Sequence, residues 1–392
     1  MKKFIEGSMA IAEAIKVCRP HVISAYPITP QTHIVENLSQ FVADGELRCE
    51  FVNVESEFGA ASVVLGAEAT GARTFSTTTS QGLLLMLEVL YNIAGLRLPV
   101  VIACANRAVS APINIWCDHQ DSFTARDTGW IQLWAEDNQE AHDMCVQAYK
   151  IGENPQICLP VMVNLDGFIL SHAFEPIEFF DQKEVDEFLP PYKPVFYLTP
   201  KNPLTFGVLA DADYYTETRY RIQKTMEDAK KVIEDVASEF KKRFGRYSGG
   251  LVENYRLEDA EIAVVSIGSV VGTIKDVIDD LRDEGKKIGV LKIRTYRPFP
   301  QEAIYEALKN VKNIMVMEKD ISLGLGGALY NEIKAAFYGR PKQPKVSGFI
   351  LGLGGRDVPQ DSIRKAIEQA EKKEVETFFV DLKKELIGGG IL

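Results

Sequence analysis

Residues 72–95 read ARTFSTTTSQGLLLMLEVLYNIAG, a β-type run followed at once by an apolar helical run. The first part, 72–79, is rich in Thr and ends in four consecutive hydroxyl residues, as expected of a short buried strand. The second part, 80–95, contains no proline and has the length and apolar content of a buried helix. A strand that leads directly into a helix is the unit from which parallel α/β sheets are built.

The same alternation continues on both sides of this stretch. Short apolar runs with helical segments between them predict further strands at 21–26, 47–54, 99–105 and 160–166. Continuous apolar strands that alternate with helices predict a parallel sheet, and we expect it to form a first α/β domain over residues 1–172. In such sheets ligands bind beyond the carboxyl ends of the strands, so functional residues are expected there.

The rest of the chain divides into three further parts. Residues 173–255 are expected to hold a Pro- and Phe-rich linker on the surface of the first domain, followed by a long amphipathic connecting helix over 211–246. The strand–helix alternation resumes at 259 and predicts a second, smaller α/β domain over residues 256–350. A C-terminal strand and charged helices are expected over 351–392.

Composition excludes several classes of protein. The net charge of −11 argues against a nucleic-acid-binding surface. No apolar run approaches the roughly 20 residues that a membrane-spanning helix needs, and the N-terminal residues indicate an amphipathic helix in place of a secretory signal. The six cysteines form no CxxC pair, so the chain is expected to hold no zinc or iron–sulfur site of its own. These features together favour a cytoplasmic protein.

Four strand ends carry residues that suggest chemistry. Thr29 lies in AYPITPQT, where prolines on both sides stiffen the backbone. Glu57 in NVESEFGA begins a helix, where it acts either as a capping carboxylate or as a catalytic one. Ser80 is a candidate helix cap, although the free N–H groups of the same helix start would also suit a ligand. Arg107 in NRA either binds a carboxylate or forms a structural salt bridge.

Two other motifs have a structural interpretation that we prefer. The loop Asp118-His119-Gln120-Asp121 has some metal-ligand character, but a loop of buried polar pairs is favoured because further ligands are missing. The run GLGG at 324–327 is half of a phosphate-binding pattern, and a tight turn into a helix is the favoured interpretation.

Eight motifs in this order resemble the α chain of the multi-subunit 2-oxoacid:ferredoxin oxidoreductases, with the pyruvate-specific members most similar. They are AYPITPQT, ESEFGAASVVLGA, TTTSQGLLLM, NRAVSAPINIW, DHQD, RDTGW, NQEAHDM and DGFILSH. The runs GSVVGTIKDVIDDLR and RTYRPFP resemble the transketolase C-terminal-like domain of the same chain. The resemblance therefore covers nearly the whole length.

The resemblance implies an enzyme that oxidatively decarboxylates a small 2-oxoacid with thiamine diphosphate, passes the acyl group to coenzyme A and reduces ferredoxin. In this family the α chain binds the aminopyrimidine of the cofactor, and a β chain supplies the site for its diphosphate and Mg²⁺. A δ chain carries [4Fe–4S] clusters and a γ chain completes the complex. The absence of Gly-Asp-Gly and Asn-Asn from this chain agrees with a shared cofactor site and with no metal site in this subunit.

The resemblance also implies roles for single residues. Glu57 matches the carboxylate that hydrogen-bonds the pyrimidine ring of the cofactor, and Ser80, Gln81 and Gly82 are expected to contact the cofactor beside it. Thr29 and Arg107 match residues that contact the 2-oxoacid. This explains why two prolines would hold one hydroxyl in place.

Phe58 departs from the pattern, because many relatives have His there, and this leaves the substrate open. Pyruvate is favoured, with 2-oxoisovalerate, 2-oxoglutarate or an aryl pyruvate as alternatives for the same chemistry. A purely structural subunit and a non-redox enzyme of the transketolase type are further alternatives.

Overall fold

The computed structural model describes residues 2–387, which fall into two compact units. Of these residues, the first unit comprises 2–252 together with 293–300, and the second comprises 253–292 together with 301–387. The chain therefore returns to the first unit after it has begun the second.

The first unit is built on a seven-stranded sheet with the order β12-β6-β7-β5-β4-β2-β3. All neighbouring pairs are parallel except that between β6 and β12. The predicted parallel α/β fold is therefore confirmed. The strands are β2 (Val22–Ala25), β3 (Glu50–Asn53), β4 (Thr74–Thr78), β5 (Val101–Asn106), β6 (Ile131–Trp134), β7 (Val161–Asp166) and β12 (Thr295–Arg297).

Helices cover both faces of this sheet because its central strands are apolar on both sides. Along β5, Val101 and Ala103 enter one hydrophobic core, while Ile102 and Cys104 enter the other. The first core is closed by α1 (Gly7–Cys18), α2 (Thr32–Ala43), α6 (Asn138–Gly152) and α8 (Tyr215–Phe244). The second is closed by α3 (Glu57–Ala69) and α4 (Ser80–Gly95).

The region expected to be a surface linker and connecting helix is largely ordered within the first unit. Strand β8 (Phe174–Glu178) pairs antiparallel with β1 (Lys2–Glu6), a strand that precedes the expected N-terminal helix. Helix α7 (Gln182–Phe188) follows. Helix α8 buries Ala229, Ile233 and Phe240 in the first core. The part expected to be a linker thus contains a strand and a short helix, and its apolar residues pack against the first unit.

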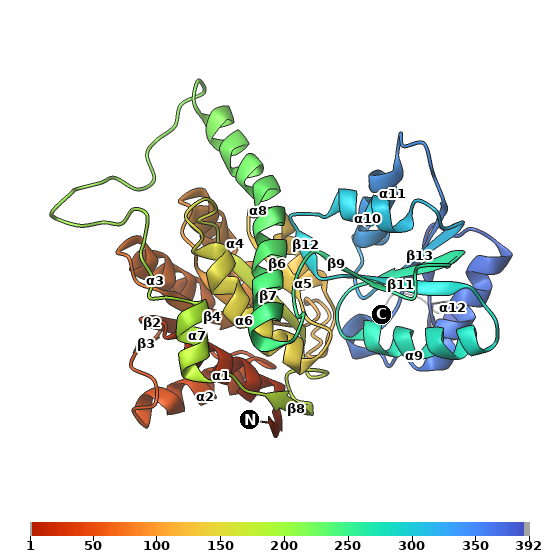
Figure 1. Cartoon of the computed structure of the whole chain (residues 1–392), viewed down its shortest axis with the longest axis horizontal. Helices are drawn as coiled ribbons and strands as arrows, with labels where there is room; N and C mark the ends of the chain where they lie inside the picture. The colour runs from red at the N-terminus through yellow and green to blue at the C-terminus, as the bar shows by residue number, and fades with distance from the viewer. Residues whose placement is uncertain (1, 388–392) are drawn as a thin grey trace. The chain divides into compact units, whose positions relative to one another are not determined.

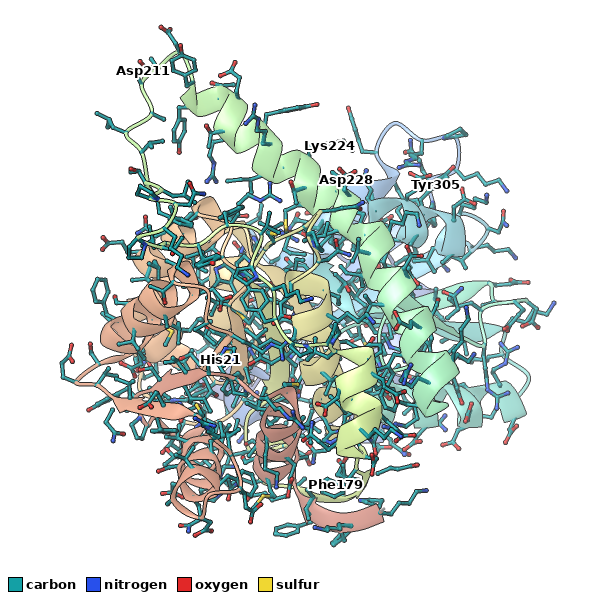
Figure 2. All side chains as sticks on the ribbon, turned by 60° about the vertical axis from the view of Figure 1, so that its left-hand side comes forward. His21, Phe179, Asp211, Lys224, Asp228 and Tyr305 are labelled. Carbon is teal, nitrogen blue, oxygen red and sulfur yellow. The ribbon has the colours of Figure 1, made fainter. Side chains whose placement is uncertain are left out.

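The outer face of α8 is charged, as its sequence predicts. Its exposed side chains include the ion pair between Lys224 and Asp228, one turn apart (Figure 2). Within the described residues, no helix is both long and apolar enough to cross a bilayer.

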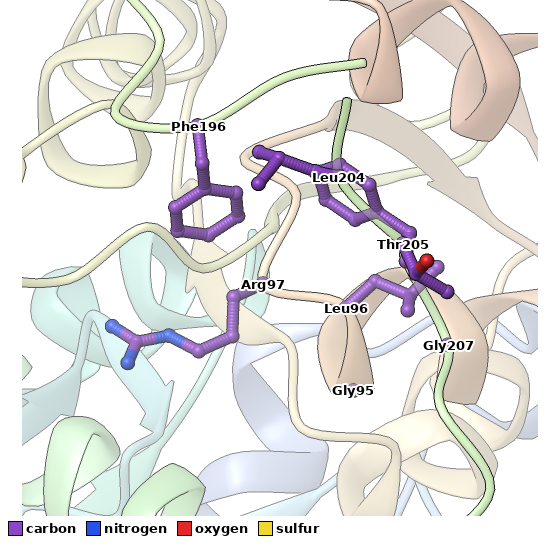
Figure 3. A pocket seen from close by; sticks show the side chains of 8 residues that line it. Gly95, Leu96, Arg97, Phe196, Leu204, Thr205 and Gly207 are labelled. Atoms are coloured by element: carbon purple, nitrogen blue, oxygen red, sulfur yellow. The ribbon is translucent and has the colours of Figure 1, made fainter. Parts of the chain in front are cut away.

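Residues 189–214, between α7 and α8, form an extended loop without helix or strand (Figure 1). This segment is attached to the helices of the second core: Leu198 N–H donates to the Ala69 carbonyl at 2.8 Å. Phe196 and Leu204 line a pocket of about 400 Å³ together with Leu96 and Arg97, which follow α4 (Figure 3).

Strand β12 lies in the motif RTYRPFP, which was expected in the second domain. It instead forms an edge strand of the first sheet, with Thr295 opposite Leu133 of β6. Tyr296 is fully buried and its ring stacks on Phe123 at 4.3 Å. Strand β6 was also not among the strands expected from the sequence.

The second unit has its own six-stranded sheet, with the order β15-β14-β13-β10-β11-β9. Its core contains apolar residues of these strands and of the helices. The strands are β9 (Val252–Tyr255), β10 (Ile262–Ser266), β11 (Ile288–Ile293), β13 (Asn313–Glu318), β14 (Lys345–Ile350) and β15 (Phe378–Phe379). The helices are α9 (Val270–Asp283), α10 (Gln301–Leu308), α11 (Ala328–Phe337) and α12 (Gln360–Lys372).

The GLGG run forms a tight turn into α11, as favoured. The N–H groups of Leu329 and Tyr330 donate to the buried Glu318 carboxylate at 2.8 and 3.0 Å. A Cβ on Gly327 would lie 1.9 Å from Glu318 Oε1, so only glycine fits here. The start of α11 is thus occupied by a carboxylate of the protein itself.

Candidate active site

The predicted site residues follow four neighbouring strands. In the sheet order, β3, β2, β4 and β5 are close neighbours, and Glu57, Thr29, Ser80 and Arg107 follow them respectively. All four residues therefore lie at the carboxyl edge of one parallel sheet, where the α/β rule expects a ligand.

Glu57 is the first residue of α3 and is held against the start of α4. The Ser56 side chain caps α3 by accepting from Gly59 N–H at 3.1 Å. A Cβ on Gly82 would lie only 2.7 Å from Glu57 Oε1 and 2.6 Å from Thr78 Oγ1. Glu57 is only 7% exposed, yet no hydrogen bond or ion pair joins its carboxylate to another residue within 2–387. The Glu57 side chain is thus largely buried and closely packed, and its carboxylate is unpaired among the described residues.

Arg107 and Thr29 are in direct contact. Arg107 Nη1 donates to the Thr29 carbonyl oxygen at 2.9 Å, and Nε donates to the Asn114 carbonyl at 3.0 Å. The Thr29 loop is held in turn by Gln31, whose Nε2 donates to the Thr77 carbonyl at 2.8 Å. The Thr29 side chain itself remains exposed.

The Arg107 guanidinium is a buried cation without a carboxylate partner. It is 6% exposed, and it forms no salt bridge with any residue that the structure describes. Burial lowers the pKa of Arg107, and the charge of Asp121 partly offsets this effect. The salt-bridge alternative therefore fails, and the arrangement suits an anionic ligand.

Ser80 and Gln81 differ in what they offer a ligand. Ser80 is fully buried, and its hydroxyl donates to the Ala108 carbonyl at 2.5 Å. Its N–H donates to Asp121 Oδ2 at 2.9 Å, so Ser80 serves the local structure. The Gln81 amide lies 2.6 Å from Ser80 Oγ and its Nε2 is buried without a partner. If the Gln81 amide were rotated by 180°, Nε2 would contact Ser80 Oγ and Oε1 would be unpaired. One polar atom of the Gln81 amide is therefore available to a ligand in either orientation.

These observations test whether the residues fit thiamine diphosphate. A carboxylate and an amide end that pair with no described residue, and a glycine that lets Glu57 pack against the start of α4, suit a polar heteroaromatic ring in close contact with two helix starts. The residues present therefore fit the aminopyrimidine part of that cofactor.

The Asp118–Asp121 loop is a buried polar network, as favoured. His119 Nε2 lies 2.8 Å from Asp166 Oδ1, and both side chains are fully buried. Cys117, His119 and Asp166 have ligand-type atoms within 4.8 Å of one another, but the direct hydrogen bond already pairs two of them. Asp121, which the sequence analysis did not assign to the site, contacts both Ser80 and Arg107.

Phe58 follows Glu57 on α3 but is 39% exposed. Its side chain is therefore at the surface of this unit, although it is adjacent in sequence to the buried carboxylate.

Comparison with family models defines the class. Residues 13–238 match the model described as pyruvate flavodoxin/ferredoxin oxidoreductase, thiamine diphosphate-binding. Residues 260–363 match the model of pyruvate:ferredoxin oxidoreductase core domain II. The fold and the site thus define a thiamine-diphosphate-binding chain of the 2-oxoacid oxidoreductase class.

Curated relatives narrow this class to a family. Pyruvate synthase subunit PorA of Methanosarcina barkeri is 55% identical over 98% of this chain and 97% of its own length. The subunit of the same name from Methanocaldococcus jannaschii is 53% identical over 97% and 98%. Ketoisovalerate oxidoreductase subunit VorA of Pyrococcus horikoshii is 45% identical over 97% and 96%. The chain belongs to the pyruvate:ferredoxin oxidoreductase family, as its motifs predict.

A solved structure agrees in fold. The 2-oxoglutarate:ferredoxin oxidoreductase from Magnetococcus marinus, with 2-oxoglutarate, coenzyme A and succinyl-CoA bound, superposes with a TM-score of 0.70 at 18% identity. The match covers 94% of this chain and 65% of that chain, so the neighbour is considerably longer.

Proposed function

We propose that this chain is the α subunit of a pyruvate:ferredoxin oxidoreductase, or pyruvate synthase. The complex converts pyruvate and coenzyme A to acetyl-CoA and CO₂, and two electrons pass to ferredoxin. The observation that carries the proposal is the pair of buried, unpaired charges, Glu57 and Arg107, at one edge of a thiamine-diphosphate-type sheet. The two curated relatives above 50% identity support pyruvate as the substrate.

The chain acts only with partners. A β subunit would supply the diphosphate and Mg²⁺ site, a δ subunit the [4Fe–4S] clusters, and a γ subunit would complete the complex. The name of the relatives as subunits supports such an assembly. We assign the transketolase C-terminal-like domain to residues 256–350, most of which lie in the second unit. We place the complex in the cytoplasm, which suits a chain whose cysteines are all free within the described residues.

Each site residue has a distinct role in this proposal. Thiamine diphosphate, when bound, supplies a nucleophilic carbon and an electron sink. Glu57 holds and moves a proton at the pyrimidine ring, because a carboxylate shielded from water can exchange a proton with one fixed partner. Arg107 binds the substrate carboxylate with Nη2, the guanidinium nitrogen that makes no hydrogen bond to a described residue, as a donor, while Thr29 donates to a second substrate oxygen. Gln81 orients the pyrimidine, and Gly82 lets the Glu57 side chain pack directly against the start of α4.

A second candidate is the same reaction on 2-oxoisovalerate, which the 45% identity to a ketoisovalerate oxidoreductase subunit supports. Arg107 would bind the carboxylate of any 2-oxoacid, including 2-oxoglutarate or an aryl pyruvate, so it does not distinguish among them. A purely structural subunit is disfavoured, because it would have no need to bury an unpaired guanidinium.

The test is steady-state ferredoxin reduction by the reconstituted complex with each 2-oxoacid in turn. The highest kcat/KM is expected for pyruvate, and a higher value for 2-oxoisovalerate would favour the second candidate.

Calorimetry of the isolated chain with thiamine diphosphate and Mg²⁺ should detect negligible binding. Tight binding to the single chain would contradict the shared site.

A further inference from the structure

Asp121 lies at the centre of the candidate site without being exposed to it. It is fully buried near the start of α5 (Gln120–Thr124). Its Oδ2 accepts from Ser80 N–H at 2.9 Å and from Arg107 N–H at 3.0 Å. Its Oδ1 accepts from Ser122 N–H at 2.7 Å and from Asn106 Nδ2 at 3.0 Å. One side chain thus joins three segments that are far apart in the sequence.

The surroundings of Asp121 select its charged form. The four nitrogen partners are all donors, and the Cys104 thiol also donates to Oδ2 at 3.8 Å, so a protonated carboxyl would find no oxygen or nitrogen acceptor among its partners. Burial raises the pKa of Asp121, and the hydrogen bonds from Asn106, Arg107, Ser80 and Ser122 oppose that rise. The resulting buried anion also acts on the buried guanidinium of Arg107, whose pKa it raises.

These contacts connect the two halves of the site. Ser80 begins the helix whose next two residues, Gln81 and Gly82, lie beside Glu57. Arg107 is the proposed partner of the substrate carboxylate. Because one oxygen of Asp121 holds both backbones, the separation between the cofactor side and the substrate side depends on it.

We infer that Asp121 is a positioning residue for 2-oxoacid binding. It holds the Arg107 backbone against the start of α4 and supplies the negative charge that keeps an unpaired guanidinium buried. This inference rests on the proposed function, since it acts through Arg107. The competing explanation is that Asp121 only stabilises the fold.

Asp143 offers a matched control for that explanation. It is also fully buried and accepts from Arg246 Nε at 2.8 Å, Arg246 Nη2 at 3.0 Å and Ser248 Oγ at 2.8 Å. Asp143 lies on α6, which covers the opposite face of the sheet from α4. Asp143→Asn should therefore lower stability without affecting the 2-oxoacid site.

The experiment compares Asp121→Asn and Asp143→Asn in the reconstituted complex. Asn retains the shape of Asp, but its NH₂ group faces N–H donors and the charge is lost. We expect Asp121→Asn to raise KM for pyruvate about ten-fold or more, the scale of one lost charge-assisted hydrogen bond, with KM for coenzyme A unchanged. Asp143→Asn should leave both KM values unchanged. An unchanged pyruvate KM in Asp121→Asn would overturn the inference.

A double-mutant cycle with Arg107→Lys separates the inference from the proposed function. If Asp121 acts through Arg107, the effect of Asp121→Asn on KM should be much smaller in the Arg107→Lys background. If the KM of the double variant instead equals the product of the two single effects, the residues act independently, and the inference about Asp121 is overturned while the role of Arg107 stands. If Arg107→Lys alone leaves pyruvate KM unchanged, the proposed substrate site fails and the inference fails with it.

A milder variant covers the case in which Asp121→Asn does not assemble. Asn106→Ala removes one donor to Asp121 Oδ1 and keeps the carboxylate in place. A few-fold rise in pyruvate KM, again without change for coenzyme A, is expected. No rise in an assembled complex would contradict the positioning role.

Discussion

The contact between Gly82 and Glu57 predicts that one added methyl group will displace the Glu57 carboxylate, for which we propose a catalytic role. In Gly82→Ala the new Cβ would lie 2.7 Å from Glu57 Oε1, 2.8 Å from Glu57 Cγ and 2.6 Å from Thr78 Oγ1. Gly82 is helical and needs no positive φ, so the backbone accepts alanine. The perturbation therefore acts on the side chain of Glu57.

The size of the displacement follows from these distances. Ordinary contact begins at 3.4 Å, so the carboxylate must move by about 0.7 Å from its 2.7 Å separation. A misplacement of about 1 Å can cost on the order of 100-fold in rate, so we expect kcat to fall about 10- to 100-fold. Overpacking costs roughly 1–3 kcal/mol, whereas replacing a helical glycine by alanine stabilises by up to about 1 kcal/mol. The net loss of stability should thus be small.

The assay is kcat for pyruvate-dependent ferredoxin reduction, with assembly checked by native mass spectrometry. Gly66→Ala is the matched control: it lies on α3 with Glu57, is exposed, and its added Cβ would meet nothing within 4 Å. This control should keep full activity and gain slight thermal stability. Wild-type kcat in an assembled Gly82→Ala complex, or an equal loss in Gly66→Ala, would refute the reasoning.

Three further outcomes are expected. Glu57→Gln keeps size but cannot exchange the proton, so kcat should fall about 10²–10⁴-fold with the complex intact, and an active Gln variant would exclude the assignment. Arg107→Lys loses the planar guanidinium, whereas Thr29→Val keeps the backbone carbonyl that accepts from Arg107. The value of kcat/KM for the 2-oxoacid should therefore fall further in Arg107→Lys than in Thr29→Val. If both variants keep the wild-type kcat/KM, neither side chain contacts the substrate. Burial raises the pKa of Glu68 to about 8 from 4.5, so the free energy of unfolding should decrease as pH rises from about 4.5 to 8, because only the unfolded chain ionises there. The stability of Glu68→Gln, measured by thermal unfolding, should depend less on pH across that range. An unchanged pH dependence would contradict the raised pKa of Glu68.

The strands of the first sheet could largely be predicted from the sequence, because each strand is recognised from a short run of neighbouring residues. The run at 72–79 is rich in Thr and the run at 99–105 is apolar, both end at residues with distinctive side chains, and both form strands inside the sheet. The four strand-end residues could be grouped from the sequence alone, because a parallel sheet places its carboxyl ends at one edge. The resemblance in motif order then assigned roles to them.

The features that were not predicted depend on contacts between distant residues. Strand β12 is three residues long, and its pairing with β6 spans more than 150 positions. The role of Asp121 has the same origin, since its partner Ser80 is 41 residues away and both are ordinary in their local sequence. Helix α8 was predicted as a helix. Its packing in the same core as α6 was not predicted, because it depends on contacts between residues far apart in the sequence.

The return of the chain to β12 also bears on synthesis at the ribosome. The first unit is incomplete until residues 293–300 have been made, although the second unit begins at residue 253. Until then β6 has an open edge with unpaired backbone groups, and Phe123 lacks the ring of Tyr296 that stacks on it. The nascent chain must therefore carry an unfinished sheet while about forty residues of the second unit emerge. A fragment that stops at residue 252 would keep this open edge permanently and should associate through it.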